Sequence, residues 1–560
     1  LLPFGGELAT NVINNTSYNM QHKVVFSRTI NEIHRLNAMA AMEIRSGENK
    51  NNTNTVWGYV PERGEILVSP TYPTEITPVG GTVPISWGAL DKLYQGGWKN
   101  TTITNNYVSF FVTFAYSLKD RYVFNANVRS DASNRFGQDA NKQFDPTYSF
   151  GISWRMAEEE FVKTYLPWLN QLNLRATYGV QGNVVTSISP DLITQYQGIL
   201  PGYNEYYLTI SSLPNPLLKW ERTKTWNLGL DLQLFNGISM SLEYYGRRSN
   251  AIINQDIAQE YGMNAMKLNG GRIHNHGLEY SVNITPYQRK DFVWTIGINA
   301  SKNWNRTQNN DIRTKADKIT KSNFLTGSSD RFLKKGYPLS AFWSYSFAGL
   351  DPETGYPTFN LIDFEEADPD IDPTTFLVYS GQKDPYFTGG VNTRARYKSF
   401  SLGVNFSVLL GAKKRLPNPY QNFRHGKLPD PFYNLSKDLL KRWQKTGDEK
   451  HTIYPALYTS VEDLYNIQLP DGTMSNSIYD MWGQSDAMVV NASFLRCTQI
   501  SLSWNMPKQI CSKFGATNCS ISANVNNPFV IGSSRFNGFD PELGDSVMPK
   551  IFSFGLSVGF

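Results

Sequence analysis

The sequence predicts an all-β fold: a large antiparallel transmembrane β-barrel with long loops at one end and short turns at the other. Three observations lead to this expectation. Apolar and polar residues alternate in many segments of the 560-residue chain, and the connections between these segments are short and long in turn. No run of about 18 apolar residues is present, which excludes a membrane-spanning helix. Barrel strands are not excluded, since they need only about 9 to 11 residues of alternating character.

The alternation is clearest in the last strand that the sequence predicts. Even positions from Phe552 to Phe560 are apolar, whereas the odd positions between them are Ser or Gly. A period of two residues indicates a strand with one apolar face. The alternation alone does not decide whether this face meets lipid or the core of a soluble sandwich.

About seventeen segments share this pattern, and their polar face is rich in Gly, Ser and Asn. The predicted strands span residues 21–30, 34–46, 107–118, 121–131, 147–156, 170–180, 222–235, 238–250, 273–285, 292–306, 339–350, 356–362, 384–397, 399–411, 493–506, 518–530 and 550–560. A short helix is expected over residues 434–444, where leucines and a tryptophan recur at helical spacing.

The lengths of the connections between the strands indicate that the apolar strand faces meet lipid and not the core of a soluble sandwich. Short connections such as 31–33, 119–120 and 236–237 alternate with long ones, of which the largest span 47–106, 181–221 and 412–492. Outer-membrane barrels have short periplasmic turns and long extracellular loops, whereas a sandwich has no reason for this asymmetry. We therefore expect the apolar faces to meet outer-membrane lipid and Phe560 to lie at the periplasmic rim.

The strand count gives a further expectation. If Phe560 is periplasmic, the first predicted strand descends, so the number of strands is odd, whereas bacterial barrels of this kind have an even number. The sequence also begins on Leu1-Leu2, without an initiator Met or an export signal. We expect residues 1–560 to be the C-terminal part of a single barrel whose first strands are missing.

Charge and cysteine content exclude several functions. The formal net charge is +5 without a long basic block, so we expect no nucleic-acid partner. Cys497, Cys511 and Cys519 are too few for a disulfide scaffold and lack the spacing of a zinc site. Cys511 and Cys519 could form a disulfide across one turn in an oxidising compartment or remain unpaired, and the sequence leaves both alternatives open.

No residue is expected to be catalytic. Gly555-Leu556-Ser557-Val558-Gly559 matches a hydrolase motif by letters, but that motif needs a strand-to-helix turn, and here it lies inside a predicted strand. The sequence therefore predicts that the protein is not an enzyme.

Metal binding is a weaker hypothesis. Asp368, Asp370 and Asp372 lie in one predicted extracellular loop, and oxygen-rich clusters suit Ca²⁺. The favoured interpretation is a solvated acidic loop, with loop-bound Ca²⁺ as the alternative and no other cofactor. His274 and His276 would lie on one strand face, but they lack a third ligand nearby and are interpreted as strand-end polar residues.

Aromatic residues near the loops are the candidate ligand-binding residues. They are Tyr203, Tyr206, Tyr207, Trp343 and Tyr345. Aromatic rings suit sugar rings or peptide side chains, because each offers a flat apolar area with a polar tip. Aromatics also form the interface girdles of barrels and pack loops, and this interpretation is the favoured one.

Several segments resemble the SusC/RagA-type TonB-dependent transporters of the Gram-negative outer membrane. They are Arg129-Ser130-Asp131-Ala132-Ser133-Asn134-Arg135-Phe136-Gly137 with Phe144, Trp154-Arg155 and Glu159-Glu160-Phe161, then Tyr178-Gly179-Val180-Gln181-Gly182-Asn183, Ser493-Phe494-Leu495-Arg496, Asn527-Pro528-Phe529 and Gly538-Phe539-Asp540-Pro541-Glu542. Ala132 and Asp145-Pro146 depart from the family pattern, in motifs of the barrel and its loops. The resemblance extends over most of the chain.

The resemblance implies a barrel of about 22 strands with an N-terminal plug. It implies active import of oligosaccharides or oligopeptides, driven through TonB and assisted by a SusD-like surface lipoprotein, with dimers of SusC–SusD pairs as a further expectation. The plug and the residues that contact TonB would lie before Leu1, and a C-terminal aromatic such as Phe560 resembles the signal for barrel assembly. The alternative is a passive porin or a surface ligand-binding barrel.

Overall fold

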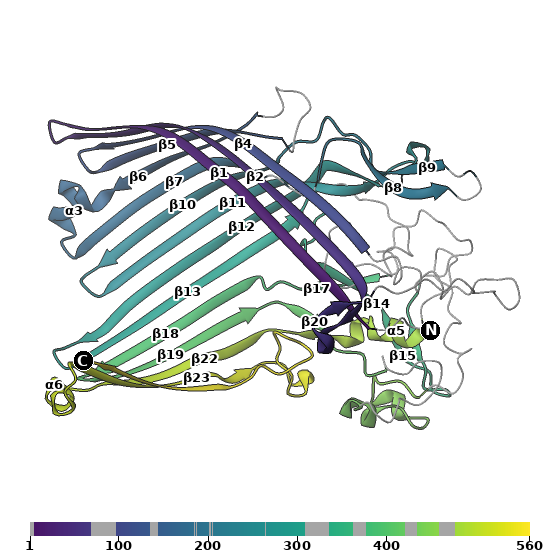
Figure 1. Cartoon of the computed structure of the whole chain (residues 1–560). Helices are drawn as coiled ribbons and strands as arrows, with labels where there is room; N and C mark the ends of the chain where they lie inside the picture. The colour runs from purple at the N-terminus through teal and green to yellow at the C-terminus, as the bar shows by residue number, and fades with distance from the viewer. Residues whose placement is uncertain are drawn as a thin grey trace, which may run out of the picture.

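One large curved antiparallel sheet, with small sheets and short helices at its ends, makes up most of the structure (Figure 1). The computed structural model describes residues 5–68, 97–134, 144–183, 185, 188–200, 203, 205–263, 265–308, 335–361, 377–420, 434–457 and 477–560. The helices in these ranges are short, and none is long and apolar enough to cross a membrane.

Fifteen strands follow one another in this sheet in chain order, each antiparallel to the next. They are β1 (Gly6–Ile30), β2 (His34–Val60), β4 (Gly97–Leu118), β5 (Tyr122–Ser133), β6 (Phe144–Arg155), β7 (Leu169–Asn183), β10 (Glu221–Leu234), β11 (Ile238–Asp256), β12 (Ala265–Gln288), β13 (Phe292–Thr307), β18 (Phe387–Tyr397), β19 (Phe400–Leu410), β22 (Phe494–Asn505), β23 (Asn518–Ile531) and β24 (Ile551–Gly559). The short β3 (Ile66–Leu67) pairs with β2 as a sixteenth member. This up-and-down order is that of a membrane barrel.

The alternating sequence gives the sheet two different faces. In the pair β10–β11, Leu228 lies opposite Tyr244 and Leu230 opposite Leu242. Leu228 and Tyr244 are exposed, as are the alternating apolar residues of most other strands. A continuous exposed apolar surface of this extent is expected where lipid covers it. The apolar face is therefore the outer surface, and polar residues such as Asp231 face the interior of the arc.

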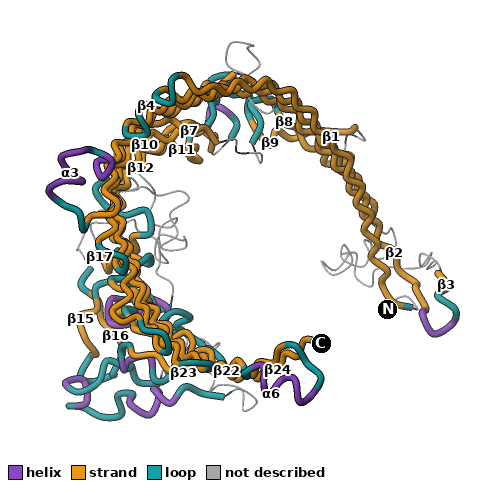
Figure 2. Tube along the Cα trace, turned by 90° about the vertical axis from the view of Figure 1, so that its left-hand side faces the viewer, coloured by secondary structure: helices purple, strands orange, loops and turns teal. Residues whose placement is uncertain are grey.

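The sheet curves into most of a ring that is open on one side (Figure 2). The strands β1 and β24 form its two edges, and within the described residues neither pairs with a further strand on its outer side. Exposed apolar residues continue to both edges, from Val24 and Phe26 on β1 to Phe554 and Leu556 on β24.

Tight turns join the strands at one end of the sheet. Asn31 and Glu32 have φ values of 51° and 57°, and Lys119 and Asp120 have 53° and 54°. Two consecutive residues with positive φ form the hairpin turns whose twist matches that of the strands. The helices α3 (Glu160–Tyr165) and α6 (Lys508–Cys511) and the C-terminus lie at this short-turn end, and the long loops lie at the other (Figure 1).

Two of the seventeen predicted strands are not in the large sheet. Residues 339–350 and 356–362 form β14 (Ala341–Tyr345), β15 (Phe347–Leu350) and β16 (Pro357–Phe359). β14 pairs with β17 (Leu377–Gln382) and β15 pairs with β16, in two separate sheets. All five residues of β14 are buried, so its apolar residues pack inside a loop instead of facing lipid.

Other strands are longer than predicted, and the predicted helix is shorter. β2 continues to Val60 and β4 begins at Gly97, inside the predicted loop 47–106. Outside the membrane both faces of a strand meet water, so alternation does not mark these extensions. The helix predicted over residues 434–444 is present only as a shorter 3-10 helix, η5 (Lys437–Lys441).

Candidate functional site

The polar inner face of the sheet is the main candidate site, and ion-pair networks link its strands. The guanidinium of Arg129 on β5 donates from Nε to Asp131 Oδ1 at 2.6 Å. Its Nη2 donates to Glu43 Oε2 on β2 at 3.1 Å and to Ser109 Oγ on β4 at 2.9 Å. One side chain thus ties three strands together on the inner face.

A second network centres on Arg175 of β7. Its Nη2 donates to Asp231 Oδ1 on β10 at 3.1 Å and to Glu243 Oε1 on β11 at 2.9 Å. Asn227 Nδ2 donates to Glu243 Oε2 at 2.9 Å, and Ser241 Oγ donates to Asp231 Oδ1 at the same distance. Ionisable residues within a membrane protein almost always face the interior and mark pathways for polar ligands.

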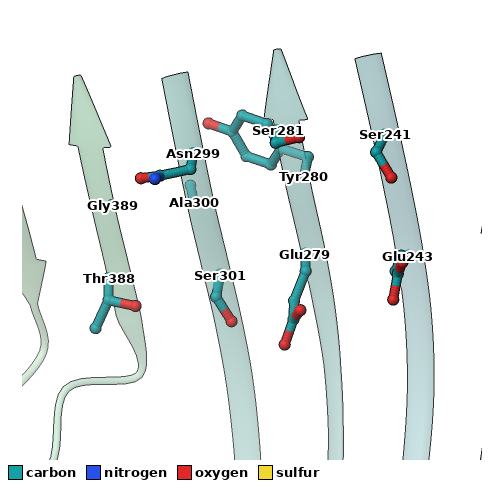
Figure 3. A pocket seen from close by; sticks show the side chains of 10 residues that line it. All are labelled: Ser241, Glu243, Glu279, Tyr280, Ser281, Asn299, Ala300, Ser301, Thr388 and Gly389. Carbon is teal, nitrogen blue, oxygen red and sulfur yellow. The ribbon is translucent and has the colours of Figure 1, made fainter. Parts of the chain in front are cut away.

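Polar residues continue along the inner face into a shallow hollow of about 470 Å³. It is lined by Ser241, Glu243, Glu279, Tyr280, Ser281, Asn299, Ala300, Ser301, Thr388 and Gly389, from four neighbouring strands (Figure 3). Hydroxyl, amide and carboxylate groups dominate this list. Such a surface can exchange hydrogen bonds with a hydrated, polar molecule passing along the wall.

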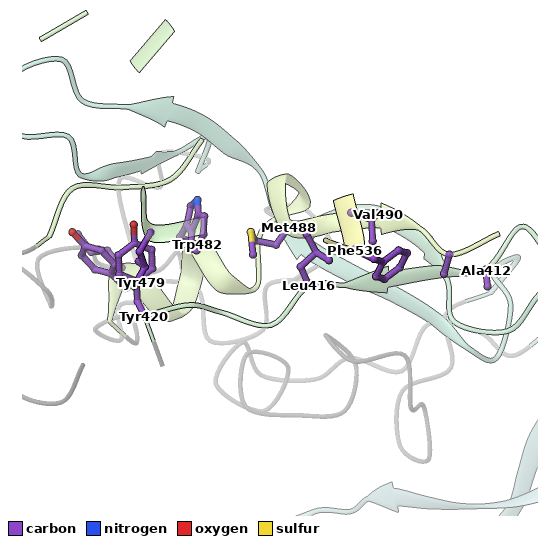
Figure 4. Close-up of a cluster of buried hydrophobic side chains, with 11 residues drawn as sticks. Ala412, Leu416, Tyr420, Tyr479, Trp482, Met488, Val490 and Phe536 are labelled. Atoms are coloured by element: carbon purple, nitrogen blue, oxygen red, sulfur yellow. The ribbon is translucent and has the colours of Figure 1, made fainter. Parts of the chain in front are cut away.

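The long loops after β13 and β19 pack into an ordered loop cap, which we define as the described residues 335–361, 377–386, 411–420, 434–457 and 477–492. Its centre is a buried cluster that includes Leu416, Tyr420, Tyr479, Trp482 and Met488 (Figure 4). Tyr420 Oη donates to the Pro455 carbonyl at 2.6 Å, and Trp482 Nε1 donates to the Ile453 carbonyl at 2.9 Å. Burial raises the pKa of Tyr420 well above its ordinary value.

The predicted aromatic residues fall into two separate groups. Trp343 and Tyr345 lie on β14 in the loop cap, with 4% and 1% of their surface exposed. The Trp343 ring contacts those of Tyr337 and Tyr379, with centroids 5.0 Å and 5.7 Å away. The packing interpretation therefore fits Trp343 and Tyr345, which offer no accessible face to a ligand.

The tyrosines of the loop 181–221 are accessible. This loop holds a hairpin, β8 (Ile193–Leu200) and β9 (Glu205–Ser212), that the sequence analysis did not predict. Tyr203 and Tyr206 are 75% and 73% exposed, and Tyr207 is half-buried. The rings of Tyr206 and Tyr196 lie 5.7 Å apart, so two aromatic faces are adjacent on the hairpin.

The predicted metal ligands form no site among the described residues, where no group of three or more His, Cys, Asp or Glu side chains is arranged to hold a metal ion. Asp368, Asp370 and Asp372 lie outside the described residues, so the Ca²⁺ hypothesis stays a prediction. The His276 ring stacks on Trp304, with centroids 5.1 Å apart.

The three cysteines carry free, buried thiols in the structure. Cys511 and Cys519 share one small buried cluster at the short-turn end. Phe560 ends the chain at the same end and is 88% exposed (Figure 1). Its suggested role in barrel assembly stays a prediction.

Glu159, Arg496 and Asp540 appear in the sequence analysis only as members of motifs. The sequence did not predict the hydrogen bonds and ion pairs that these residues form. Glu159, beside α3, accepts hydrogen bonds from Tyr122 Oη at 2.7 Å, Arg121 Nη1 at 2.9 Å and Trp154 Nε1 at 3.1 Å. At the long-loop end, Arg496 pairs with Asp540 at 2.7 Å. Glu159, Trp154, Arg496 and Asp540 lie in the segments that carry the family resemblance, and this resemblance is the signal that could have identified them, whereas Arg121 and Tyr122 lie outside those segments.

An antiparallel meander with an apolar exterior, charged networks inside and an ordered loop cap defines a membrane barrel of the transporter class. The chain belongs to the TonB dependent receptor-like β-barrel family, whose profile matches residues 10–413. Within this family it is of the SusC/RagA type, as its relatives indicate, and receptors of this type are outer-membrane proteins.

The relatives are longer than this chain. It is 28% identical over 488 residues to the TonB-dependent receptor SusC of Bacteroides thetaiotaomicron, covering 81% of this chain and 44% of SusC. It is 24% identical over 560 residues to the TonB-dependent receptor P26 of Formosa agariphila, covering 96% of this chain and 51% of P26. The solved RagAB peptide transporter has the same fold, with a TM-score of 0.75 at 21% identity, and the match covers 99% of this chain and 56% of that one. The chain spans about half the length of the curated relatives that it matches.

Proposed function

We propose that this chain acts, as part of a longer protein, in the TonB-dependent active import of oligosaccharides or oligopeptides across the outer membrane. The observation that carries the proposal is the polar inner face, where the Arg129 and Arg175 networks line an arc with an apolar exterior. A lipid-facing barrel with a charged interior provides a path for hydrophilic solutes. The known peptide transporter of this fold supports the assignment.

The open arc supports the proposal that further strands complete the barrel. Within the described part of the chain, the outer edges of β1 and β24 have no partner strand, and in lipid each unpaired backbone group would cost roughly several kcal/mol. Strands from the rest of a longer protein would pair with both edges. We propose that this remainder also supplies the plug and the segment that contacts TonB.

The loop cap and the exposed tyrosines support ligand capture from outside the cell. An ordered cap gives a SusD-like surface lipoprotein a fixed surface on which to dock, and a dimer of such pairs is a further part of the proposal. Tyr203, Tyr206 and Tyr207 offer aromatic faces to sugar rings or peptide side chains. No bond is made or broken in this function, so the protein is proposed to be a transporter and not an enzyme.

Growth of a deletion strain on a panel of glycans and peptides tests the proposal and identifies the substrate class. We expect the strain to lose growth on one class and to regain it when the full-length gene is restored. Unchanged growth and uptake on every oligomer would contradict it. A passive porin, the alternative function, would admit small solutes without preference for one class.

A further inference from the structure

A basic cavity of about 470 Å³ is lined by residues of the loop cap and by residues 543–545 of the loop before β24. Its lining includes four cationic side chains and two carboxylates, namely Lys383, Lys413, Lys414, Arg415, Asp480 and Asp545. At neutral pH the four positive and two negative charges leave a formal charge of two positive units. Like charges gathered in one cavity destabilise the protein unless a ligand or a counter-ion offsets them.

Two of the lysine side chains pass close to glycines. Lys413 and Lys414 belong to β20 (Lys413–Arg415), which pairs with β21 (Val489–Asn491). A Cβ on Gly381, whose φ is +118°, would lie 2.5 Å from Lys413 Cγ. A Cβ on Gly544 would lie 3.3 Å from Lys414 Cδ. Each glycine therefore leaves room for a lysine stem, and a side chain at Gly381 would require the Lys413 stem to shift.

Two of the four cations have structural roles. Arg415 Nη2 donates to the Trp343 carbonyl at 3.0 Å and to Ser344 Oγ at 2.7 Å, which ties β20 to β14. Lys414 Nζ donates to the Glu542 carbonyl. Burial lowers the pKa of Lys414. The nearby carboxylate of Glu542 opposes this shift, and the neighbouring charge of Lys383 adds to it.

Lys383 and Lys413 are the cations available to a ligand. Among the described residues, no hydrogen bond or ion pair engages the ammonium group of either lysine. The cavity is also bordered by Phe342, Leu416 and Leu543, so an apolar surface lies beside the charges. A ligand with one negative charge and an apolar or ring-shaped body fits this lining better than a polyanion, because Asp480 and Asp545 would repel a high negative charge.

We propose that this cavity binds a carboxylate carried by the imported oligomer, with Lys383 and Lys413 as the recognising cations. The inference rests on the proposed import function and specifies its substrate class as acidic. The carboxylate could come from a uronic acid of an oligosaccharide or from the C-terminus of a peptide. The recognising chemistry is the same for both sources.

Binding of matched acidic and neutral probes to the full-length transporter in detergent tests this assignment. One pair is a trisaccharide that carries a single terminal glucuronic acid and the methyl ester of that trisaccharide, and the other is N-acetyl-trialanine and its C-terminal amide. We expect one acid to bind about tenfold more tightly than its neutral partner, as for one charged contact. The pair that shows the difference identifies the source of the carboxylate. Equal affinity of acid and neutral form in both pairs would overturn the proposal.

Variants separate recognition from general charge effects. Lys383→Gln with Lys413→Gln should abolish the preference for the acid, whereas Lys383→Arg with Lys413→Arg should retain it. The control removes two exposed lysines elsewhere in the loop cap, Lys437→Gln and Lys445→Gln, and should leave the preference unchanged. If the control variant also lost the preference for the acid, the preference would arise from the overall positive charge of the loop cap. That result would contradict a binding site at Lys383 and Lys413.

Failure of the carboxylate-binding proposal can be distinguished from failure of the import proposal. If the wild-type protein binds acid and neutral form equally in both pairs but still takes up oligomers only in the presence of TonB, the cavity assignment fails and the import proposal stands. Conversely, uptake that does not depend on TonB would refute import, while the preference for an acidic probe could still be measured in detergent.

Discussion

The guanidinium of Arg496 lies 2.7 Å from the carboxylate of Asp540, and each side chain is only 4% exposed. The two residues are 44 positions apart, one at the start of β22 and the other in the loop before β24. Asp540 Oδ1 also accepts from the backbone N–H of Glu542, and the Asp540 carbonyl accepts from that of Gly544. This pair therefore fixes the last long loop to the sheet.

The buried pair should be essential for stability. Asp540→Asn removes the buried carboxylate and leaves Arg496 with only the half-exposed Glu542, 3.0 Å away, as its counter-charge. Breaking a buried pair completely costs about 3–5 kcal/mol, so about 3 kcal/mol is the cost expected for this partial loss. We expect a loss of this size in the free energy of unfolding, measured by urea titration in detergent. The control is Glu158→Gln, which removes the exposed pair with Lys163, and should cost less than about 1 kcal/mol. Equal losses in the two variants would disprove the role of burial.

Glu159 should give the short-turn end a pH-dependent stability. The hydrogen bond from Tyr122, together with those from Trp154 and Arg121, lowers the pKa of Glu159 below its ordinary value of 4.5. A carboxyl with a depressed folded-state pKa stabilises the protein above its unfolded-state pKa, and this contribution is lost as pH falls through the folded-state pKa.

Glu159→Gln should accordingly lower the Tm at pH 7, and the difference from the wild type should shrink as the pH falls below 4.5. Thermal unfolding followed by circular dichroism from pH 7 downwards measures this. A difference in Tm that stays constant over the whole range would show that the charge of Glu159 contributes nothing.

The Arg175 network should behave as one unit. Arg175→Met leaves Asp231 and Glu243 as neighbouring carboxylates without their cation, which should cost about 1–3 kcal/mol. Adding Asp231→Asn and Glu243→Gln to this variant removes the repulsion and should recover part of the loss. The free energy of unfolding is measured for the single and the triple variant. A triple variant that is less stable than Arg175→Met alone would show that the three residues do not act as one unit.

The exposed and buried tyrosines should respond differently to truncation. Tyr206→Ala should weaken ligand binding by about 0.5–1.5 kcal/mol, the contribution of one aromatic contact, without changing stability. Tyr345→Ala should instead destabilise the loop cap by about 3–5 kcal/mol, because it leaves a large cavity. Binding and unfolding are measured on both variants, and a stability loss from Tyr206→Ala would indicate a packing role for the hairpin.

The sequence predicted the membrane part of the fold well because lipid imposes a pattern on it. Each strand that faces lipid on one side and a polar interior on the other must alternate, so positions such as Leu228 and Leu230 identify it. Beyond the membrane this constraint ends. The extensions of β2 and β4 and the hairpin β8–β9 were missed for this reason, and β14, which is buried on both faces, was placed in the wrong sheet.

The candidate site was less predictable because its contacts join distant segments. The basic cavity combines Lys383 with Lys413 and with the segment around Gly544. No spacing rule along the chain relates these positions, since only the folding of three loops brings them together. The same holds for Arg129, which reaches Glu43 across 86 positions of the sequence.

Uptake of a labelled oligomer by cells that carry the full-length protein tests most directly whether it is an energised importer. Accumulation is compared between cells with and without TonB, and with and without an uncoupler that collapses the proton gradient. Active import predicts accumulation above the external concentration that is lost when either TonB or the gradient is removed. Entry at the same rate without TonB, stopping at the external concentration, would contradict it and favour a passive porin.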